Sequence, residues 1–403
     1  MLVNFRLFLI IPLTLLIGSA SAQASRLTTL HSFCSEPQGS ACLDGKTPAT
    51  RMVEIGGELY GTASAGGSKM LGTLYRVSTG GSFTLLHTFC EKAHCSDGAR
   101  PGRYLTRGAL GAVYGVTAGG GLADGGTIFR VSGAGAFSLV HKFCSEARCS
   151  DGIQPISVLF DGTTGALFGT AAAGGSHSAG TAFMIDRGGV FHVLHNFCSQ
   201  SGCGDGISPG ALVRGLDGNF YGTTLAGGKN HAGTVFRMTP AGAVTVLHSF
   251  CAAKNCADGE QPAPALVEGR NGDFYGTTAQ KGAYRSGTIF AVSSAGVLRT
   301  LHSFCARSNC PDGATPIDGM VRAKDGSFYG TASAGGRFYY GVVYHLTEAG
   351  TYSIVYDFCA LHGCFDGASP DASPIFGSDG LLYGVTAAGG NRDNVGTVYR
   401  LEP

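Results

Sequence analysis

Tryptophan is absent from the 403-residue chain, and charged residues make up only 14% of it. The 28 basic and 27 acidic residues nearly balance, so the formal net charge at pH 7 is +1. Such a chain lacks the broad positive surface that attracts nucleic acids or anionic membranes. We therefore expect no nucleic-acid partner.

Long apolar runs are also missing beyond the N-terminus. Arg6 precedes an apolar run at 7–17, and Ala20-Ser21-Ala22 offers small residues for cleavage. The run is shorter than the roughly 20 residues of a membrane-spanning helix, and the combination is typical of a secretory signal. We predict a signal peptide at residues 1–22, cleavage near Ala22, no membrane insertion, and a secreted or periplasmic mature chain at 23–403.

Glycine is abundant, with 66 residues, and 44% of the chain is hydrophobic. Glycine at this frequency indicates many tight turns. Short runs rich in Val, Ile, Phe, Tyr and Thr end at Gly, Asp-Gly or Pro, and no helical periodicity is evident. The composition therefore predicts an all-β protein.

Four landmarks recur seven times in fixed order, about 54 residues apart. Leu-His-Ser-Phe-Cys or a close variant is followed by Cys-x-Asp-Gly, then by Tyr/Phe-Gly-Thr/Val-Thr/Ala, then by Gly-Thr and an apolar-aromatic run. Each repeat holds four strand-like runs, which is typical of a propeller blade. In the fourth repeat these runs are 211–215, 219–224, 234–239 and 243–250.

The repeats predict a single seven-bladed β-propeller over residues 23–403, with four antiparallel strands per blade. The chain begins with a lone fourth-strand run at 27–33 and ends with a repeat of only three strands, the last at 397–401. We predict that these two runs pair and close the ring, which removes two exposed sheet edges. The blades are expected at roughly 48–90, 101–144, 155–198, 209–251, 262–305, 316–359, and 370–401 with 27–33.

Fourteen cysteines in seven local pairs predict disulfide bonds in a secreted chain. Zinc is the alternative, but it takes about four ligands, whereas each blade offers two cysteines. We expect neither a metal nor a cofactor. The predicted disulfides join Cys34 to Cys42, Cys90 to Cys95, Cys144 to Cys149, Cys198 to Cys203, Cys251 to Cys256, Cys305 to Cys310, and Cys359 to Cys364.

The aspartates and histidines that repeat with the blades are interpreted as structural. An aspartate before glycine bonds neighbouring backbone amides, and one carboxylate per blade is too few for calcium. The histidines fall on the outermost strands, and we expect them to be half-buried and to bond a neighbouring loop. The histidines are His31, His87, His141, His195, His248 and His302, with Tyr356 in the seventh blade.

The run from Tyr221 to Arg237, Tyr-Gly-Thr-Thr-x-Ala-Gly-Gly-x4-Gly-Thr-Val-Phe-Arg, resembles the GloVer-type tandem repeats of bacterial secreted proteins, also described as choice-of-anchor repeats. The resemblance covers essentially the whole mature chain and implies an extracellular β-propeller. It brings no established activity and no catalytic residue. The regular cysteine pairs go beyond this repeat pattern.

Function is expected where the repeats differ most, in the loops between the second and third strands. Antiparallel order brings these loops to the same face as the disulfide loops. Aromatic rings there suit sugar faces, and arginine forks bind carboxylates. We predict ligand contacts from His177, His231, Tyr284, Arg285, Arg337, Tyr339 and Arg392.

Two functions are compatible with these loops. The first is a non-catalytic binding or scaffolding propeller, expected as a monomer, that holds a glycan or a protein ligand on this face. The second is a glycan-active enzyme, such as a polysaccharide lyase. In it His177 or His231 with Tyr284 would handle the proton, and Arg285 or Arg337 would neutralise the substrate carboxylate. We favour the first, because no catalytic constellation is evident.

Deletion of residues 23–34 is expected to destabilise the C-terminal blade, because it leaves the edge at 397–401 unpaired. Thermal unfolding of the truncated and full-length mature chains measures this effect. An unchanged unfolding midpoint would contradict the predicted closure.

Overall fold

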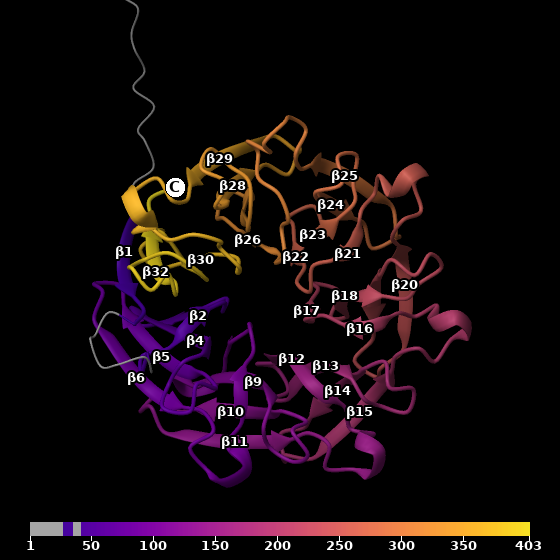
Figure 1. Ribbon diagram of the computed structural model, residues 1–403. Coiled ribbons are helices and arrows are strands. Elements are labelled where there is room, and N and C mark those ends of the chain that lie inside the picture. The colour runs from indigo at the N-terminus through magenta and orange to yellow at the C-terminus, as the bar shows by residue number, and fades with distance from the viewer. Residues whose placement is uncertain (1–26, 35–41) are drawn as a thin grey trace, which may run out of the picture.

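The computed structural model describes residues 27–34 and 42–403, which form seven β-sheets arranged as the blades of a ring (Figure 1). The predicted all-β, seven-bladed propeller is confirmed. The predicted signal peptide, residues 1–22, lies outside the described residues. Within the described ranges, no helix combines the length and apolar character needed to cross a membrane.

In the first six blades the strands run in chain order from the centre of the ring to its rim, and in the seventh the N-terminal strand β1 lies outermost (Figure 1). The first blade contains β2 (Lys46–Pro48), β3 (Val53–Ile55), β4 (Glu58–Ala65), β5 (Thr73–Ser78) and β6 (Phe83–Thr88). The second contains β7 (Ala99–Pro101), β8 (Thr106–Arg107), β9 (Val113–Gly119), β10 (Thr127–Val131) and β11 (Phe137–Lys142). The third contains β12 (Ile153–Phe160), β13 (Leu167–Ala173), β14 (Thr181–Ile185) and β15 (Phe191–Asn196).

The remaining blades follow the same order. The fourth contains β16 (Ile207–Pro209), β17 (Val213–Arg214), β18 (Phe220–Ala226), β19 (Thr234–Met238) and β20 (Val244–Ser249). The fifth contains β21 (Glu260–Pro262), β22 (Val267–Glu268), β23 (Phe274–Gln280), β24 (Thr288–Val292) and β25 (Leu298–Ser303). The sixth contains β26 (Met320–Arg322), β27 (Phe328–Ala332), β28 (Val342–Leu346) and β29 (Tyr352–Asp357). The seventh contains β30 (Ile375–Phe376), β31 (Leu382–Thr386), β32 (Thr397–Leu401) and β1 (Leu27–Ser32).

The helices within the described residues are single 3-10 turns. One lies in the hairpin between β8 and β9, and the others lie in disulfide loops. They are η2 (Ala93–Cys95), η3 (Ala109–Gly111), η4 (Ala147–Cys149), η5 (Ser201–Cys203), η6 (Lys254–Cys256) and η7 (His362–Cys364).

The innermost strand is interrupted in the first, second, fourth and fifth blades. In the fourth blade, β16 and β17 both pair with β18, whereas one inner run at 211–215 was expected. Pro209 at the end of β16 has no backbone N–H, and the residue before it has a φ of 59°. Both features interrupt a regular ladder.

The ring is closed by its two ends, as predicted. β1 pairs antiparallel with β32, with Leu27 opposite Leu401 and Ser32 opposite Thr397. Beyond the strand, the Phe33 N–H donates to the Gly396 carbonyl at 3.1 Å. The N-terminal strand thereby supplies the outermost strand of the seventh blade.

Neighbouring blades meet at a junction between a proline and a glycine. The proline lies six residues after the second cysteine of each repeat. Its ring packs against a glycine of the preceding blade and fills the space that a Cβ would need if that glycine were any other residue. The residue before the proline has a φ of 52–59°, and its N–H donates to a carbonyl of the preceding blade at 2.8–3.0 Å. The pairs are Gly396 with Pro48, Gly72 with Pro101, Gly126 with Pro155, Gly180 with Pro209, Gly233 with Pro262, Gly287 with Pro316, and Gly341 with Pro370.

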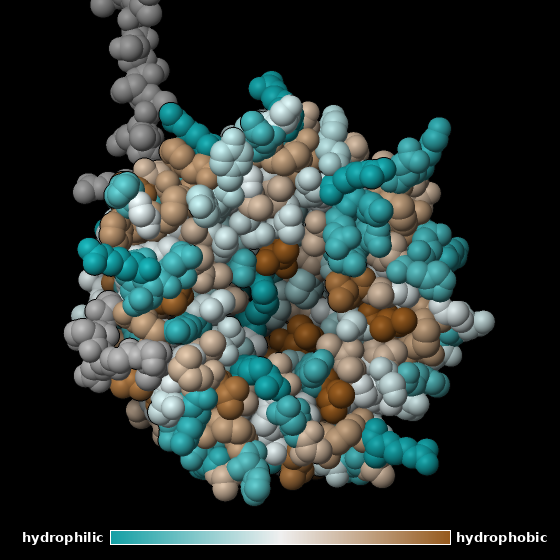
Figure 2. Space-filling model, in the orientation of Figure 1, coloured by the Kyte–Doolittle hydropathy of each residue, from teal (hydrophilic) through white to brown (hydrophobic). Residues whose placement is uncertain are grey.

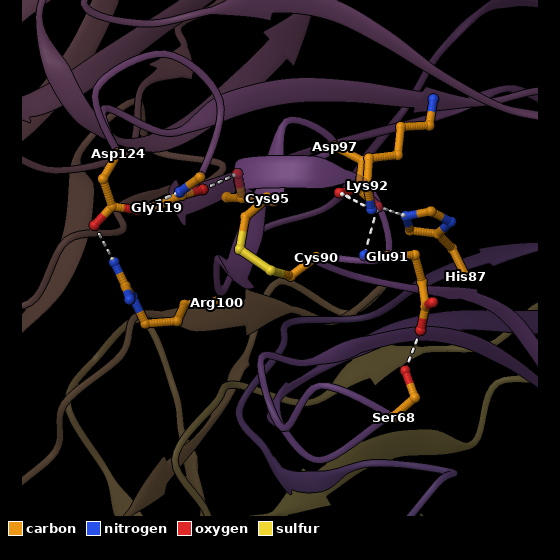
Figure 3. The surroundings of a disulfide bond; sticks show 12 residues. Ser68, His87, Cys90, Glu91, Lys92, Cys95, Asp97, Arg100, Gly119 and Asp124 are labelled. Carbon is orange, nitrogen blue, oxygen red and sulfur yellow. Dashed lines mark hydrogen bonds and ion pairs between the residues drawn. A yellow bond between two sulfur atoms is a disulfide. The ribbon is translucent and has the colours of Figure 1, made fainter.

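The disulfide loops are held from inside by the repeated aspartates. All seven predicted disulfides form. In the loop of Figure 3, Asp97 accepts hydrogen bonds from the backbone N–H groups of Glu91 and Lys92 at 3.2 and 3.3 Å, and its carboxylate lies 3.2 Å from His87 Nε2. The predicted bonds of the aspartate to neighbouring backbone amides and of the histidine to a loop are both present here.

The same contact recurs around the outer rim. The six histidine side chains are 14–19% exposed, and the Tyr356 hydroxyl takes the histidine's place by donating to Asp366 at 2.8 Å. His87 also stacks on Phe137 of the next blade, with ring centroids 3.8 Å apart. The histidine therefore links its own disulfide loop to the neighbouring blade.

Burial lowers the pKa of His87, His141 and His302 below the ordinary 6.5, and the aspartates offset this only in part. The unfolded chain consequently binds more protons than the folded protein as the pH falls below 6.5. These histidines stabilise the fold above that pH, and their contribution is lost on acidification.

Gly396→Ala is expected to cost more stability than Gly380→Ala, although both glycines have positive φ. A Cβ on Gly380 meets nothing within 4 Å, so this control costs about 1–2 kcal/mol for its backbone conformation. A Cβ on Gly396 meets the Pro48 ring and the Thr386 carbonyl, which adds about 1–3 kcal/mol of overpacking. Urea unfolding of both variants measures the difference, and equal losses would refute the importance of the junction.

Replacing His87, His141 and His302 together by tyrosine, the residue found at Tyr356, is expected to reduce the stability lost on acidification. Tyrosine keeps a donor for the aspartate but takes up no proton in this range. Unfolding free energies at about pH 7 and about pH 5.5 measure the effect. Tyr356→His is the reciprocal control and should increase the loss. A triple variant that loses as much stability as the wild type would contradict this assignment.

Candidate functional site

The predicted ligand residues all lie in exposed turns between second and third strands. The turns share a face with the disulfide loops. In each blade a glycine N–H of the turn donates to the carbonyl of the second cysteine in the disulfide loop that leads into that blade, as Gly228 does to Cys203 at 3.0 Å. The turn between β13 and β14 holds His177, the turn between β18 and β19 holds His231, the turn between β23 and β24 holds Tyr284 and Arg285, the turn between β27 and β28 holds Arg337 and Tyr339, and the turn between β31 and β32 holds Arg392.

These residues belong to five successive blades. In the described part of the chain, no hydrogen bond joins the side chains of any two of them. Tyr284 and Tyr339 are 51% and 59% exposed, and the Arg337 guanidinium lies over the neighbouring Phe338 ring at 5.5 Å. The structure thus brings them to one face as separate groups. The proton-handling pair imagined for a lyase, a histidine with Tyr284, is not hydrogen-bonded.

A central pocket of about 430 Å³ opens on the same face. Its wall includes Thr47 and Arg100, which precede junction prolines, and Ser64 at the end of a second strand. Arg100 pairs with Asp124 of the adjoining loop at 3.0 Å, as Figure 3 shows. The centre of the ring is visibly hollowed in Figure 2, where hydrophilic and hydrophobic residues both surround the opening.

Tyr104 forms the floor of this pocket. Its hydroxyl donates to Asp318 Oδ1 at 2.6 Å, joining the second blade to the sixth across the centre of the ring. The other Asp318 oxygen accepts the Ser373 N–H at 2.8 Å. Burial and the Asp318 carboxylate raise the pKa of Tyr104 well above its usual value, so the hydroxyl stays a donor. Tyr104 also lines a pocket on the opposite side and separates the two.

Arg103 and Asp371 place opposite charges at the wall of the pocket. The Arg103 guanidinium donates to the Asp371 backbone carbonyl at 2.7 Å. Burial raises the pKa of the Asp371 carboxyl, and the nearby Arg103 works against this rise. The pocket can therefore present cationic donors, hydroxyls and one carboxyl group to a ligand.

Sequence reasoning missed these central residues because it searched the loops. Arg103 and Tyr104 stand two and three residues after Pro101, and Asp318 stands two residues after its own junction proline. The equivalent residues in the other blades are mostly small or apolar, such as Ala211. A large or charged residue at a position that is otherwise small was the available signal.

A metal centre finds no support in the described ranges. The single group of three adjacent metal-ligating side chains there is Cys251, Cys256 and Glu260. The two cysteines form a disulfide, so they offer no thiolate ligand.

Solved structures share the propeller fold at low sequence identity. Virginiamycin B lyase from Staphylococcus aureus superposes with a TM-score of 0.60 at 10% identity, over 94% of this chain and 99% of that one. The extracellular domain of a protein described as a hybrid two-component system, BT4673 of B. thetaiotaomicron, gives 0.59 at 8% identity, over 93% and 39%. Puromycin hydrolase gives 0.53 at 12% identity, over 87% and 52%. These likenesses concern the fold alone.

No curated protein matches the chain in sequence. The family model of the Gloeobacter/Verrucomicrobia repeat matches residues 18–205 and 157–399, which together span nearly the whole chain. This match confirms the resemblance to GloVer-type repeats, and the chain belongs to the Gloeobacter/Verrucomicrobia repeat family.

Proposed function

We propose that this propeller binds a carboxylated glycan without transforming it, at the central pocket on the face of the disulfide loops. The observation that carries the proposal is the lining of that pocket, which combines Arg100 and Arg103 with hydroxyl groups and a single carboxyl. Arginine recognises carboxylates by paired hydrogen bonds, and hydroxyl groups match the donors and acceptors of sugars.

The dimensions and charge of the pocket suit such a ligand. A volume of about 430 Å³ falls in the range of small-molecule clefts. Arg103 has five N–H donors, and the Asp371 carbonyl takes one nitrogen, so donors are left for a uronate. Seven disulfides indicate an oxidising extracellular or periplasmic compartment, where polysaccharides and their fragments are available ligands.

The variable turns supply an outer rim for longer ligands. Tyr284 and Tyr339 keep about half of their surface exposed, and such rings can pack on sugar faces. We assign contacts with the more distant sugar units to these tyrosines together with His177, His231, Arg285, Arg337 and Arg392. A protein ligand on the same rim is the competing occupant.

A glycan-active enzyme is the second candidate, and Asp371 is the observation that favours it. Its raised pKa suits acid–base chemistry, and Arg103 stands beside it in the pocket. A lyase and a hydrolase share the fold, but a fold alone does not carry an activity. Asp371 is a better candidate for an acid–base group than a histidine with Tyr284, because it lines the central pocket beside Arg103.

A glycan array with uronate-rich and neutral oligosaccharides, followed by calorimetry with oligogalacturonate, tests the proposal. Arg103→Gln is expected to weaken binding at least about tenfold, because a charge-assisted hydrogen bond is lost. Tyr284→Ala should weaken only longer oligomers. Arg187→Gln, in the exposed turn between β14 and β15, is the control. Unchanged affinity in Arg103→Gln, or an array on which only neutral glycans bind, would overturn the proposal.

Product analysis separates binding from catalysis. Binding without shortened or unsaturated products supports the binding function. Turnover that disappears in Asp371→Asn, with binding retained, would establish the enzyme instead.

A further inference from the structure

The opposite mouth of the channel holds a second pocket, of about 380 Å³, beneath Tyr104. Its walls come from the ends of the inner strands, where the chain turns into the hairpins between first and second strands. Val53, Val213 and Val267 mark these ends. The pocket therefore opens on the face opposite the disulfide loops, away from the proposed glycan site.

An aliphatic collar surrounds this pocket. We use this name for Val53, Leu159, Val213, Val267 and Ile375, which line it from five blades. Each stands opposite the tyrosine or phenylalanine of its second strand in the sheet register, so all five occupy one repeat position. All five are only half-buried. The propeller thus leaves a ring of aliphatic surface open to solvent.

Arg51 brings a charge into this apolar setting. It is half-buried in the pocket wall, and its backbone N–H donates to the Arg103 carbonyl at 2.7 Å, beside Tyr104. Among residues 27–34 and 42–403, its guanidinium has no hydrogen-bond or ion-pair partner. No aspartate or glutamate lines the pocket, and the second cation of the lining, Arg107, is exposed. The nearby Asp318 is already engaged by Tyr104 and Ser373.

We propose that this pocket binds a medium-chain aliphatic carboxylate. The carboxylate pairs with Arg51, and the alkyl chain lies along the aliphatic collar. The charge of Arg51 selects the carboxylate, and the aliphatic collar selects the alkyl chain. A sugar would leave hydroxyls unpaired against the collar, and a neutral hydrocarbon would leave Arg51 without a partner. The volume lies at the small end of known ligand clefts.

Titration of the mature protein with octanoate, 1-octanol and octyltrimethylammonium tests the assignment. The wild type should bind octanoate at least about tenfold more tightly than either comparator, because only octanoate forms a charge-assisted bond with Arg51. Arg51→Met should remove this preference while it retains weak binding of 1-octanol. Equal binding of octanoate and 1-octanol by the wild type, or no octanoate binding, would overturn the proposal.

A second variant tests the apolar half of the site. Val213→Asn combined with Val267→Asn should weaken octanoate and 1-octanol alike, whereas Arg187→Gln should change neither. Thermal unfolding checks that each variant is folded. The comparison of ligands on the wild type decides the question even where a variant fails to fold. Because Tyr104 separates the two pockets, octanoate binding is expected to be independent of oligogalacturonate, and either proposal can fail alone.

Discussion

The contact between each junction proline and the glycine of the preceding blade is the constraint on which the ring depends. A propeller blade cannot bury both faces of its sheet alone, so its stability comes from its neighbours. Glycine leaves room for the proline ring, and the amide before the proline adds a backbone hydrogen bond at each junction. Pro48 and Gly396 form the same contact between the two ends of the chain. The junction that closes the ring therefore uses the same pair of residue types as the other six junctions.

The outer rim is ordered by a second repeated unit. The aspartate of each disulfide loop gathers backbone amides and a histidine or Tyr356, and several histidines stack on an aromatic ring of the next blade. The repeated residues therefore make contacts that stabilise the fold, both near the centre of the ring and at its rim. Chemistry specific to this protein is left to positions where a blade departs from the repeat.

Features that are local or repeated could be predicted from the sequence. The disulfides, the strand runs and the pairing of 27–33 with 397–401 follow from spacing and phase. The histidines were expected to bond a loop, but their aspartate partners were not identified. Histidine and aspartate stand ten residues apart in five blades and thirteen apart for His31 and Asp44, and they meet only once the disulfide loop folds back. The Tyr104–Asp318 bond joins residues 214 positions apart and depends on the curvature of the whole ring. Neither residue belongs to a landmark, and the one signal in the sequence was a large or charged side chain two or three residues after a junction proline.

The channel thus becomes two pockets of different character, divided by Tyr104. One faces the variable loops and is lined by Arg100, Arg103, Asp371 and several hydroxyl groups. The other contains the aliphatic collar together with Arg51 and the exposed Arg107. The central claim is that the residues departing from the repeat at the inner radius hold the ligand. A crystal structure of the mature chain with oligogalacturonate tests it most directly. The account predicts a uronate carboxylate within hydrogen-bond distance of the Arg103 guanidinium, and a sugar bound only at the outer turns or between blades would contradict it.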